Sequence, residues 1–283
     1  MYFWISLCFL VLIFPRVGPA ETSKDLIESL PTGSINWTKG VVEAKGLFFS
    51  NHPFVQDSPA LAPLQQAQRM AAENALHTLE RIQVDATRRI ADMALLNVDI
   101  GARLKKMAEN AHLIHEVQLP GGTLEATVRI DLLGGLAQMI LPEEIKQLET
   151  IKPLFSVSAS RAREADNLSE STYSGLIVDA RGIGAQPAMA PLLVDENGKQ
   201  IFGSAFASRE YAVQYGMCEY VRSPDSANRM VRIGLQPLMV KGLRTFNERS
   251  CDIIISNADA ARLRDASAHL DFLKQCRVMI VLD

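Results

Sequence analysis

The sequence predicts an α+β protein of two small domains, each a mostly antiparallel sheet with helices packed on one face. Apolar residues recur at steps of three and four from Leu64 to Ile82, which is typical of an amphipathic helix. From Thr123 to Leu132 they alternate with polar residues, as in a half-buried strand. The stretch Tyr173–Phe202 combines short apolar runs with glycine and proline turns, which indicates successive strands.

Length and composition agree with this class. The chain has 283 residues, of which 48% are hydrophobic and 22% are charged, so two ordinary domains with buried cores are expected. The formal net charge is -3 with the two signs mixed. No basic face is evident, and we therefore expect no nucleic-acid partner.

Residues 1–20 are expected to be a signal peptide. Tyr2–Phe14 is almost entirely apolar and is followed by small residues ending at Ala20, after which cleavage is expected. This run of about 13 residues is shorter than the roughly 20 that a membrane span needs. An uncleaved anchor is the alternative. Cys8 lacks the small residues that precede a lipidated cysteine, so we do not interpret it as a lipid attachment site.

An N-terminal domain is expected over residues 35–141, after a polar linker at residues 21–34. Ile35–Phe49 is interpreted as a strand with bends at Gly40 and Gly46, and the proline-containing stretch Asn51–Pro63 as a loop. The helix that follows carries a narrow, alanine-rich apolar stripe. The stripe consists of Leu64, Ala67, Ala71, Ala75, Leu79 and Ile82.

A second helical stretch is predicted from Thr87 to Asn110, interrupted near residues 98–101. The residues expected on its buried side are Leu95, Val98, Leu104 and Met107. Ala111–Leu119 and Thr123–Leu132 flank Pro120-Gly121-Gly122, which predicts a hairpin. Leu133–Leu141 is expected to form a short closing helix.

Residues 142–171 are interpreted as a second linker, and residues 172–283 as the C-terminal domain. The strands expected there are Gly175–Asp179, Leu192–Val194, Lys199–Phe202, Met230–Leu235, Leu238–Gly242, Asp252–Ile255 and Arg277–Leu282. Asn197-Gly198 predicts a hairpin turn, and a helix is expected from Ala258 to Lys274. The final strand, helix and strand are consistent with a parallel crossover.

The residue pattern resembles a bacterial envelope family. The Trp37-x-x-Gly40 start, the alanine-rich helix ending near Ile82-Gln83-Val84-Asp85 and the hairpin running into Leu132–Leu136 are similar to the N-terminal module of the Lpp-twenty lipoproteins and of flagellar assembly protein T. Residues 175–203 and 252–283 resemble longer members. This resemblance covers most of residues 33–283. It implies a periplasmic or outer-membrane-associated protein, with no catalytic residues to carry over.

Three motifs admit a functional interpretation. Asp179–Gly184 follows a strand and could cradle a phosphate or form a charged site; a tight turn held by an Asp179–Arg181 contact is favoured, since neither GxGxxG nor a Walker lysine is present. His112 and His115 are the closest pair of histidines, but residues three apart on a strand point to opposite faces. Asp259, Asp265 and Asp271 are expected on a solvated helix face.

The remaining histidines, His52, His77 and His269, are isolated, and the alternating Ser156, Ser158 and Ser160 need no chemical explanation. With Cys8 removed, three cysteines remain: Cys218, Cys251 and Cys276. Their spacing argues against zinc, and three buried thiols are favoured over one disulfide plus one thiol. No GxSxG, HExxH or SxxK site is evident, so no catalytic, cofactor-binding or metal-binding residue and no cofactor is assigned.

The sequence therefore favours a non-catalytic secreted cell-envelope protein, a structural or assembly factor in a periplasmic or outer-membrane apparatus, with the flagellum one candidate. Expected partners are other envelope proteins or further copies of the chain, and membranes only by peripheral association. The edge strands and the alanine-rich helix are the expected contact surfaces. The alternative is a periplasmic small-ligand binding protein with Asp179–Gly184 at the mouth of the pocket.

Overall fold

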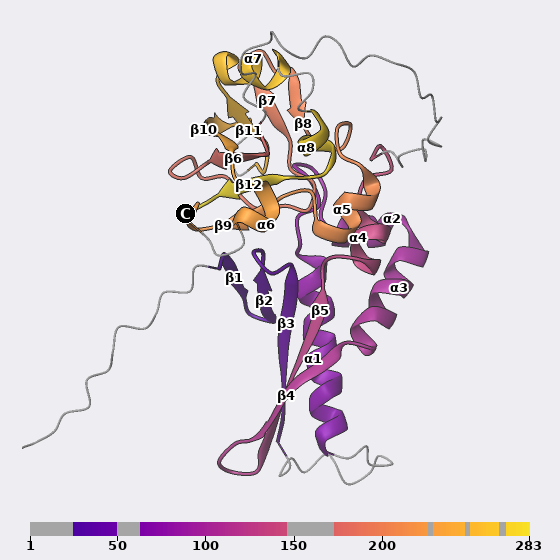
Figure 1. Ribbon diagram of the computed structural model, residues 1–283. Helices are drawn as coiled ribbons and strands as arrows, with labels where there is room; N and C mark the ends of the chain where they lie inside the picture. The colour runs from indigo at the N-terminus through magenta and orange to yellow at the C-terminus, as the bar shows by residue number, and fades with distance from the viewer. Residues whose placement is uncertain (1–24, 50–62, 146–172, 226–228, 247–249, 266–269) are drawn as a thin grey trace, which may run out of the picture.

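The computed structural model describes residues 25–49, 63–145, 173–225, 229–246, 250–265 and 270–283. Two sheet-and-helix bodies lie one against the other, with the N-terminal domain below the C-terminal domain in Figure 1. The α+β class expected from the sequence is confirmed. The expected signal peptide at residues 1–20 and most of the expected linker at 142–171 lie outside the described residues.

The N-terminal domain is built on a five-stranded antiparallel sheet of order β1-β2-β3-β5-β4. Its elements are β1 (Ile27–Leu30), β2 (Gly33–Asn36), β3 (Val41–Phe49), α1 (Pro63–Glu80), α2 (Ile90–Leu96), α3 (Val98–Glu109), β4 (His112–Gln118), β5 (Thr123–Asp131) and α4 (Gly135–Ile140). The hairpin and the short closing helix match the predicted elements. The expected linker at 21–34 is corrected, because β1 and the start of β2 fall within it.

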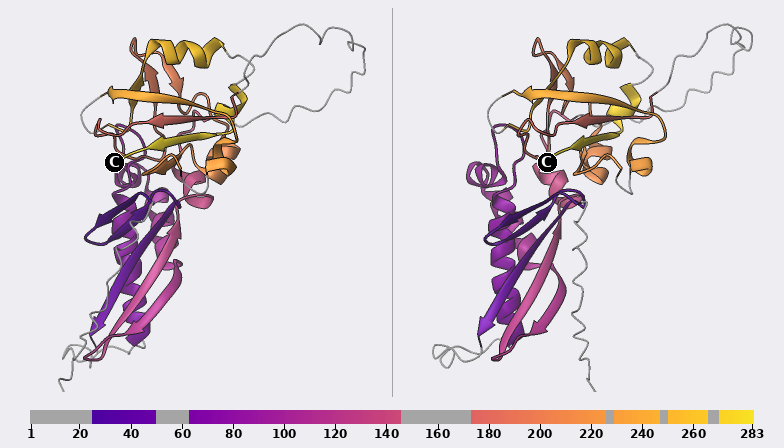
Figure 2. Two further views of the ribbon diagram at one scale, coloured as in Figure 1. Left: turned by 60° about the vertical axis from the view of Figure 1, so that its left-hand side comes forward. Right: turned by 90° about the vertical axis from the view of Figure 1, so that its left-hand side faces the viewer.

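Helix α1 covers one face of this sheet through its alanine stripe (Figure 2). Ala67, Ala71 and Ala75 are at most 1% exposed, and Leu79 is fully buried. A Cβ at Gly46 of β3 would lie 2.1 Å from the carbonyl oxygen of Ala67. Small residues on both elements therefore let the helix backbone approach the strand, as the sequence predicts.

The second helical stretch is broken into α2 and α3 at Asn97. The Asn97 side chain accepts hydrogen bonds from the backbone amides of Asp99 and Ile100, which caps α3. The chain turns there, so Leu95 and Val98 project outward and are 84% and 82% exposed. Their expected burial is wrong, whereas Leu104 and Ala108 of α3 are buried as a helix face should be.

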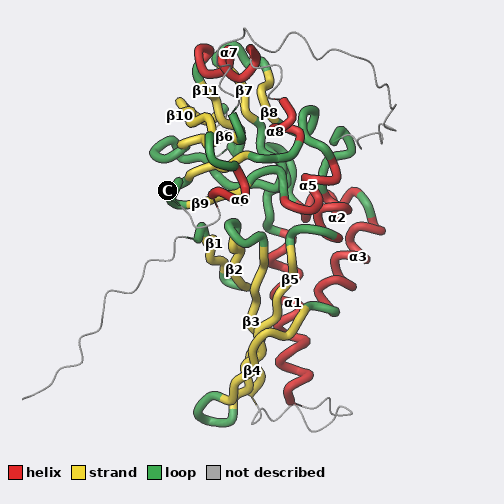
Figure 3. The backbone as a smooth tube through the Cα atoms, in the orientation of Figure 1, coloured by secondary structure: helices red, strands yellow, loops and turns green. Residues whose placement is uncertain are grey.

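The C-terminal domain is built on a seven-stranded mixed sheet of order β8-β7-β11-β10-β6-β12-β9. Its elements are β6 (Gly175–Asp179), β7 (Leu193–Asp195), β8 (Gln200–Phe202), α5 (Arg209–Tyr215), β9 (Glu219–Val221), α6 (Arg229–Ile233), β10 (Pro237–Thr245), β11 (Ile253–Ile255), α7 (Asn257–Asp265), α8 (Leu270–Lys274) and β12 (Val278–Val281). Figure 3 shows the strands gathered in one layer among short helices.

Strand direction in this second sheet differs from the expectation. β6 is parallel to both β10 and β12, β12 is parallel to β9, and β11 is parallel to β7; the β10–β11 and β7–β8 pairs are antiparallel. A mostly antiparallel sheet is therefore confirmed for the N-terminal domain and corrected for this one. β11 and β12 are not neighbours and run in opposite directions, so the expected parallel crossover between them is also wrong.

Strands β6 and β12 are buried on both faces. Leu176, Val178 and Ile280 join the main core, whereas Ile177 and Met279 form a second cluster with Ile233 of α6. The prediction that helices pack on only one face of this sheet is therefore wrong. Strands with parallel partners on both sides are usually buried on both faces by other elements. The residues of α6 were expected to form a strand at 230–235.

The two domains share one hydrophobic core, which runs from the α1–β3 interface to the face of β6 and β10. Backbone hydrogen bonds cross the boundary, from Met189 N to Gln83 O at 3.0 Å and from Ala190 N to Val84 O at 2.8 Å. Asp25 also forms an antiparallel bridge with Val221, the last residue of β9. The N-terminal domain therefore packs against the outer strand of the second sheet.

Candidate functional site

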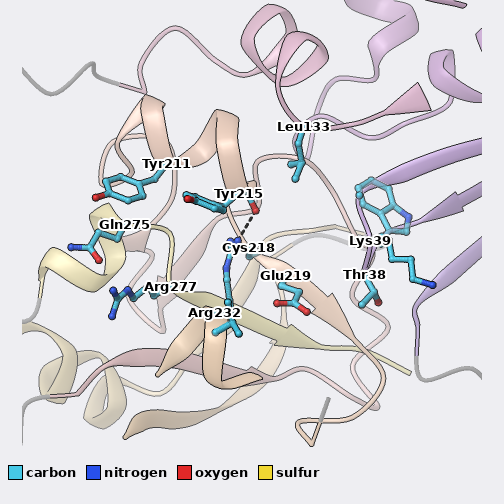
Figure 4. A pocket seen from close by; sticks show the side chains of 13 residues that line it. Thr38, Lys39, Leu133, Tyr211, Tyr215, Cys218, Glu219, Arg232, Gln275 and Arg277 are labelled. Atoms are coloured by element: carbon cyan, nitrogen blue, oxygen red, sulfur yellow. Dashed lines mark hydrogen bonds between the residues drawn. The ribbon is translucent and has the colours of Figure 1, made fainter. Parts of the chain in front are cut away.

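A cleft of about 570 Å³ lies where the domains meet. The N-terminal domain contributes the turn between β2 and β3, residues 37–40, together with Leu133. The C-terminal domain contributes α5, β9, α6 and the connection from α8 to β12. Figure 4 shows Arg232 below Tyr215 and beside Glu219, with Lys39 at one end of the cleft and Arg277 at the other.

The guanidinium of Arg232 is held by backbone carbonyls. Its terminal nitrogens donate to Tyr215 O and, at 2.8 Å, to Gly216 O, both at the end of α5. Its Nε is buried and has no hydrogen-bond partner among the described residues. Burial lowers the pKa of Arg232, since desolvation disfavours the charged form.

Glu219, at the start of β9, carries the complementary charge. Its Oε1 is also buried without a hydrogen-bond partner among the described residues. Burial raises the pKa of this carboxyl, and the charge of Arg232 opposes that rise only through space. The cleft thus holds a cation and an anion that do not satisfy one another.

The thiol of Cys218 also lines the cleft, but it is not a ready nucleophile. Burial raises its pKa to about 12, and burial likewise raises the pKa of Cys276 to about 12. The thiolate, and not the thiol, is the reactive form of cysteine. At neutral pH these side chains act as small apolar groups. All three described cysteines are free; Cys251 and Cys276 are buried, as the favoured interpretation expected, and Cys218 is half-buried.

Aromatic side chains line the wall of the cleft. The rings of Tyr211 and Tyr215 stack with centroids 6.3 Å apart. Trp37 donates from Nε1 to the Glu28 carboxylate at 3.0 Å, which holds its indole in place. Tyr215 is 55% exposed and Val231 of α6 is 89% exposed. The site therefore combines apolar surface with two unsatisfied charged groups.

The bend at Asp179–Gly184 is a tight turn held by the predicted ion pair. Arg181 donates to both carboxylate oxygens of Asp179, at 2.8 and 2.7 Å, and these hydrogen bonds lower the pKa of Asp179. Gly182, with φ +77°, donates its amide to Asp283 at 2.9 Å. The described clefts do not include these residues in their walls. Neither the phosphate interpretation nor the pocket-mouth interpretation gains support.

The structure corrects the argument about His112 and His115. β4 shifts register between Leu113 and His115, so His112 pairs with Arg129 and His115 with Thr127. Those two β5 residues are two apart, and both histidines therefore point to the same face. Within the described residues, no group of three or more His, Cys, Asp or Glu side chains could hold a metal ion.

The helix acids form ion pairs; Asp271 is exposed, as expected for a solvated face, whereas Asp259 is half-buried and also accepts a hydrogen bond from the Ser256 hydroxyl. Asp259 contacts Arg262 at 3.2 Å and Asp271 contacts Lys274 at 3.5 Å. His77 lies 3.3 Å from Glu80 on the surface of α1. His52, His269, Ser156, Ser158, Ser160 and the side chain of Asp265 lie outside the described residues.

Sequence reasoning missed the cleft residues Cys218, Glu219 and Arg232. Cys218 and Glu219 fall in residues 205–229, whose secondary structure the sequence leaves open, and Arg232 falls in α6, which the sequence predicts as a strand. The available signals were Glu219 at the start of the short stretch that forms β9 and Arg232 beside the apolar residues of α6. Such a signal carries little weight without knowledge of the fold.

Strand β4 is a second candidate site. It forms the outer edge of the first sheet, and no described strand pairs with its free side. Six of its seven residues are exposed, among them Leu113 at 41% and Ile114 at 39%. Unpaired edges of this kind can accept a further strand.

A third exposed apolar surface is the corner between α2 and α3. It consists of Leu95, Leu96 and Val98, which are 84%, 85% and 82% exposed. In the part of the chain that the structure describes, no helix combines the length and apolarity of a membrane span.

Residues 175–283 match the family described as Treponema pallidum Tp0624, second domain. The matched segment begins at β6 and covers the C-terminal domain but none of the N-terminal domain. The chain matches no curated protein. The resemblance to the Lpp-twenty and flagellar assembly families stays a prediction.

Proposed function

We propose that this protein is an exported, non-catalytic component of the bacterial cell envelope that acts as a structural or assembly factor in the periplasm or at the outer membrane. The observation that carries the proposal is the free edge of β4. The two domains share one hydrophobic core, and the N-terminal domain presents this edge on a hairpin that extends away from the C-terminal domain (Figure 1).

The chemistry of β4 suits pairing with an extended segment of another protein. Backbone amides and carbonyls on an unpaired edge provide affinity, and the alternating side chains provide selectivity. Leu113, Ile114 and Val117 supply apolar contacts, whereas the shift of register at Ile114 limits unselective edge pairing. We assign the edge to a strand of another envelope protein; pairing with a second copy of β4 is the other outcome that the test resolves.

The alanine-rich helix is not part of this contact surface. Its apolar stripe is buried against β3 and β5, so it is already used within the protein. Of the two surfaces expected from the sequence, the strand edge is the one that remains open.

A non-catalytic role is supported by the state of the cleft. Burial raises the pKa of its cysteine to about 12 and keeps it in the thiol form, and the opposing effect of the Arg232 charge does not reverse this. Export is supported by the apolar leader at residues 1–20, and not by any described structural feature.

Peripheral contact with a membrane is part of the same proposal. The corner of Leu95, Leu96 and Val98 would enter the interfacial region of a bilayer. Arg103, Lys105 and Lys106 follow on α3 and are exposed, so they complement anionic headgroups.

The test is affinity co-purification from envelope fractions of the native host. We expect the tagged wild-type protein to retain a discrete envelope partner, and the Ile114→Lys/Val117→Lys variant to lose it. A matched variant on the exposed face of α1, Arg69→Glu, should retain it. A monomeric protein with no envelope partner, or a partner unaffected by the β4 substitutions, would contradict the proposal; loss of a homodimer would identify self-association.

A further inference from the structure

The interdomain cleft contains an unsatisfied pair of opposite charges. Arg232 Nε has no acceptor and Glu219 Oε1 has no donor among the described residues, although both atoms are buried. Buried polar atoms in native proteins are nearly always hydrogen-bonded, and the exceptions mark functional sites or sites filled by a bound molecule. Two such atoms of opposite charge lining one cleft therefore point to a missing partner.

The two side chains come from different elements that the fold holds in place. Arg232 lies on α6 and is anchored through its terminal nitrogens to the carbonyls that end α5. Glu219 begins β9, which is paired along its length with β12. Among the described residues no group bridges the two buried atoms, so a bound molecule could satisfy both.

We propose that the cleft binds a small zwitterion of the amino-acid type, with its carboxylate toward Arg232, its ammonium toward Glu219 and an apolar side group against Tyr215 and Val231. Such a molecule carries an acceptor and a donor a few atoms apart, which neither a simple anion nor a simple amine does. A guanidinium matches a carboxylate in geometry as well as in charge.

The rest of the cleft agrees with this class of ligand. Its volume of about 570 Å³ lies within the range of small-molecule sites. Glu219 is the one carboxylate among the lining residues, whereas Lys39, Arg232 and Arg277 are cationic. Lys39 is paired with Asp25 at 2.8 Å, which leaves Arg232 and Arg277 to attract a carboxylate. Exposed Tyr215 and Val231 provide the apolar surface.

This inference is independent of the β4 edge, and its failure would leave the assembly role standing. It also differs from the ligand site expected from the sequence, because residues 179–184 lie elsewhere. The two sites can be tested on the same preparation, since substitutions in the cleft leave β4 untouched.

Trp37 provides a local reporter of binding. The chain has two tryptophans, Trp4 and Trp37, and Trp37 lines the cleft. A protein expressed without residues 1–20 retains all the described residues and has Trp37 as its single tryptophan. Three probes of matched shape would be titrated: L-phenylalanine, 3-phenylpropanoate, which lacks the ammonium, and 2-phenylethylamine, which lacks the carboxylate. We expect saturable fluorescence changes with L-phenylalanine, and binding weaker by about tenfold or more for each analogue.

Two cleft variants separate the roles of the charges. Glu219→Gln should weaken the binding of L-phenylalanine by about tenfold and leave the binding of 3-phenylpropanoate unchanged. Arg232→Lys should weaken the binding of both of these carboxylate probes. Arg262→Gln, in an exposed ion pair on α7, should change neither. Circular dichroism confirms that each variant is folded. No saturable response to L-phenylalanine, or equal binding of all three probes and all variants, would overturn the inference.

Discussion

The indole of Trp37 meets the phenol ring of Tyr220 edge to face, with centroids 5.8 Å apart and ring planes at 76°. Trp37 lies in the turn after β2 of the first sheet and Tyr220 in β9 of the second, so this contact joins the two domains beside the cleft that Trp37 lines. The hydroxyl of Tyr220 donates to Ala188 O at 2.9 Å and accepts from Ala188 N at 3.0 Å. One side chain thereby connects β9, the 180–190 segment and the N-terminal domain.

Tyr220→Phe is expected to destabilise the whole protein. The substitution keeps the ring contact but leaves the amide and carbonyl of Ala188 unsatisfied in a buried site, at a cost of about 1–3 kcal/mol. Urea denaturation followed by circular dichroism and by Trp37 fluorescence should show one coincident, shifted transition. Separate transitions for the two signals would show that the domains unfold independently.

Gly46→Ala is expected to be strongly destabilising. The added Cβ would lie 2.1 Å from Ala67 O and 2.3 Å from Ala71 N, and both are backbone atoms of α1 that cannot move alone. Overpacking of this kind costs about 1–3 kcal/mol or more. Gly101→Ala is the matched control, because its nearest contact would be 3.6 Å away within helical backbone. It should stabilise by about 0.5–1 kcal/mol, and equal effects of the two substitutions would contradict the packing of α1 on β3.

Asp195→Asn is expected to lower stability at neutral pH but not in acid. Asp195 is 2% exposed and accepts from Arg264 and from the amides of Asn197 and Lys199; the Arg264 hydrogen bond is the main cause of its lowered pKa. A carboxyl whose pKa is lowered by folding stabilises the protein at pH values above its pKa in the unfolded chain, which is about 3.9 for Asp. This stabilisation is lost as the pH falls through the lower pKa of the folded state.

The measurement is the urea midpoint of wild type and Asp195→Asn between pH 7 and pH 3. The difference should be largest at pH 7 and should shrink below about pH 4. The asparagine still accepts from the two amides, so the turn before β8 is retained. Asp271→Asn, which removes an exposed ion pair with Lys274, should have little effect at either pH. A difference for Asp195 that is constant with pH would contradict an ionic role.

The thiols should resist alkylation in the native state. A pKa of about 12 against the ordinary 9.0 lowers the thiolate fraction of Cys218 by about a thousandfold at pH 8. Iodoacetamide should therefore label the protein lacking residues 1–20 only after urea is added, with three sites then modified. Rapid labelling of Cys218 without denaturant would show that the cleft thiol is accessible and reactive.

Leu95→Ser/Leu96→Ser is expected to leave stability within about 0.5 kcal/mol of wild type, because both side chains are more than four-fifths exposed. If the corner contacts lipid, the variant should lose sedimentation with vesicles containing phosphatidylglycerol. Leu113→Ser on β4 serves as the control and should retain it. Vesicle binding that is unchanged in the double variant would remove the corner from the proposed membrane contact.

Local patterns predicted much of this fold. The alanine stripe of α1, the hairpin of β4 and β5, and the Asn-Gly turn before β8 all lie within short windows where periodicity and turn residues decide the structure. Where local patterns were ambiguous, prediction failed: α6 was taken for a strand, and Leu95 and Val98 were placed in a core. A helical period cannot show that Asn97 turns the chain and sends both side chains outward.

By itself the sequence determined the α+β class, the existence of most strands and helices, and the apolar leader. Only the tertiary structure decided the parallel pairing of β6, the burial of its two faces, the shared facing of His112 and His115, and the placement of Arg232 and Glu219 in one cleft. The reason is physical: turns and amphipathic periods depend on neighbours in the chain. Strand order, bulges and clefts instead depend on which surfaces from distant parts of the chain pack together. The sequence of a single segment does not predict that packing.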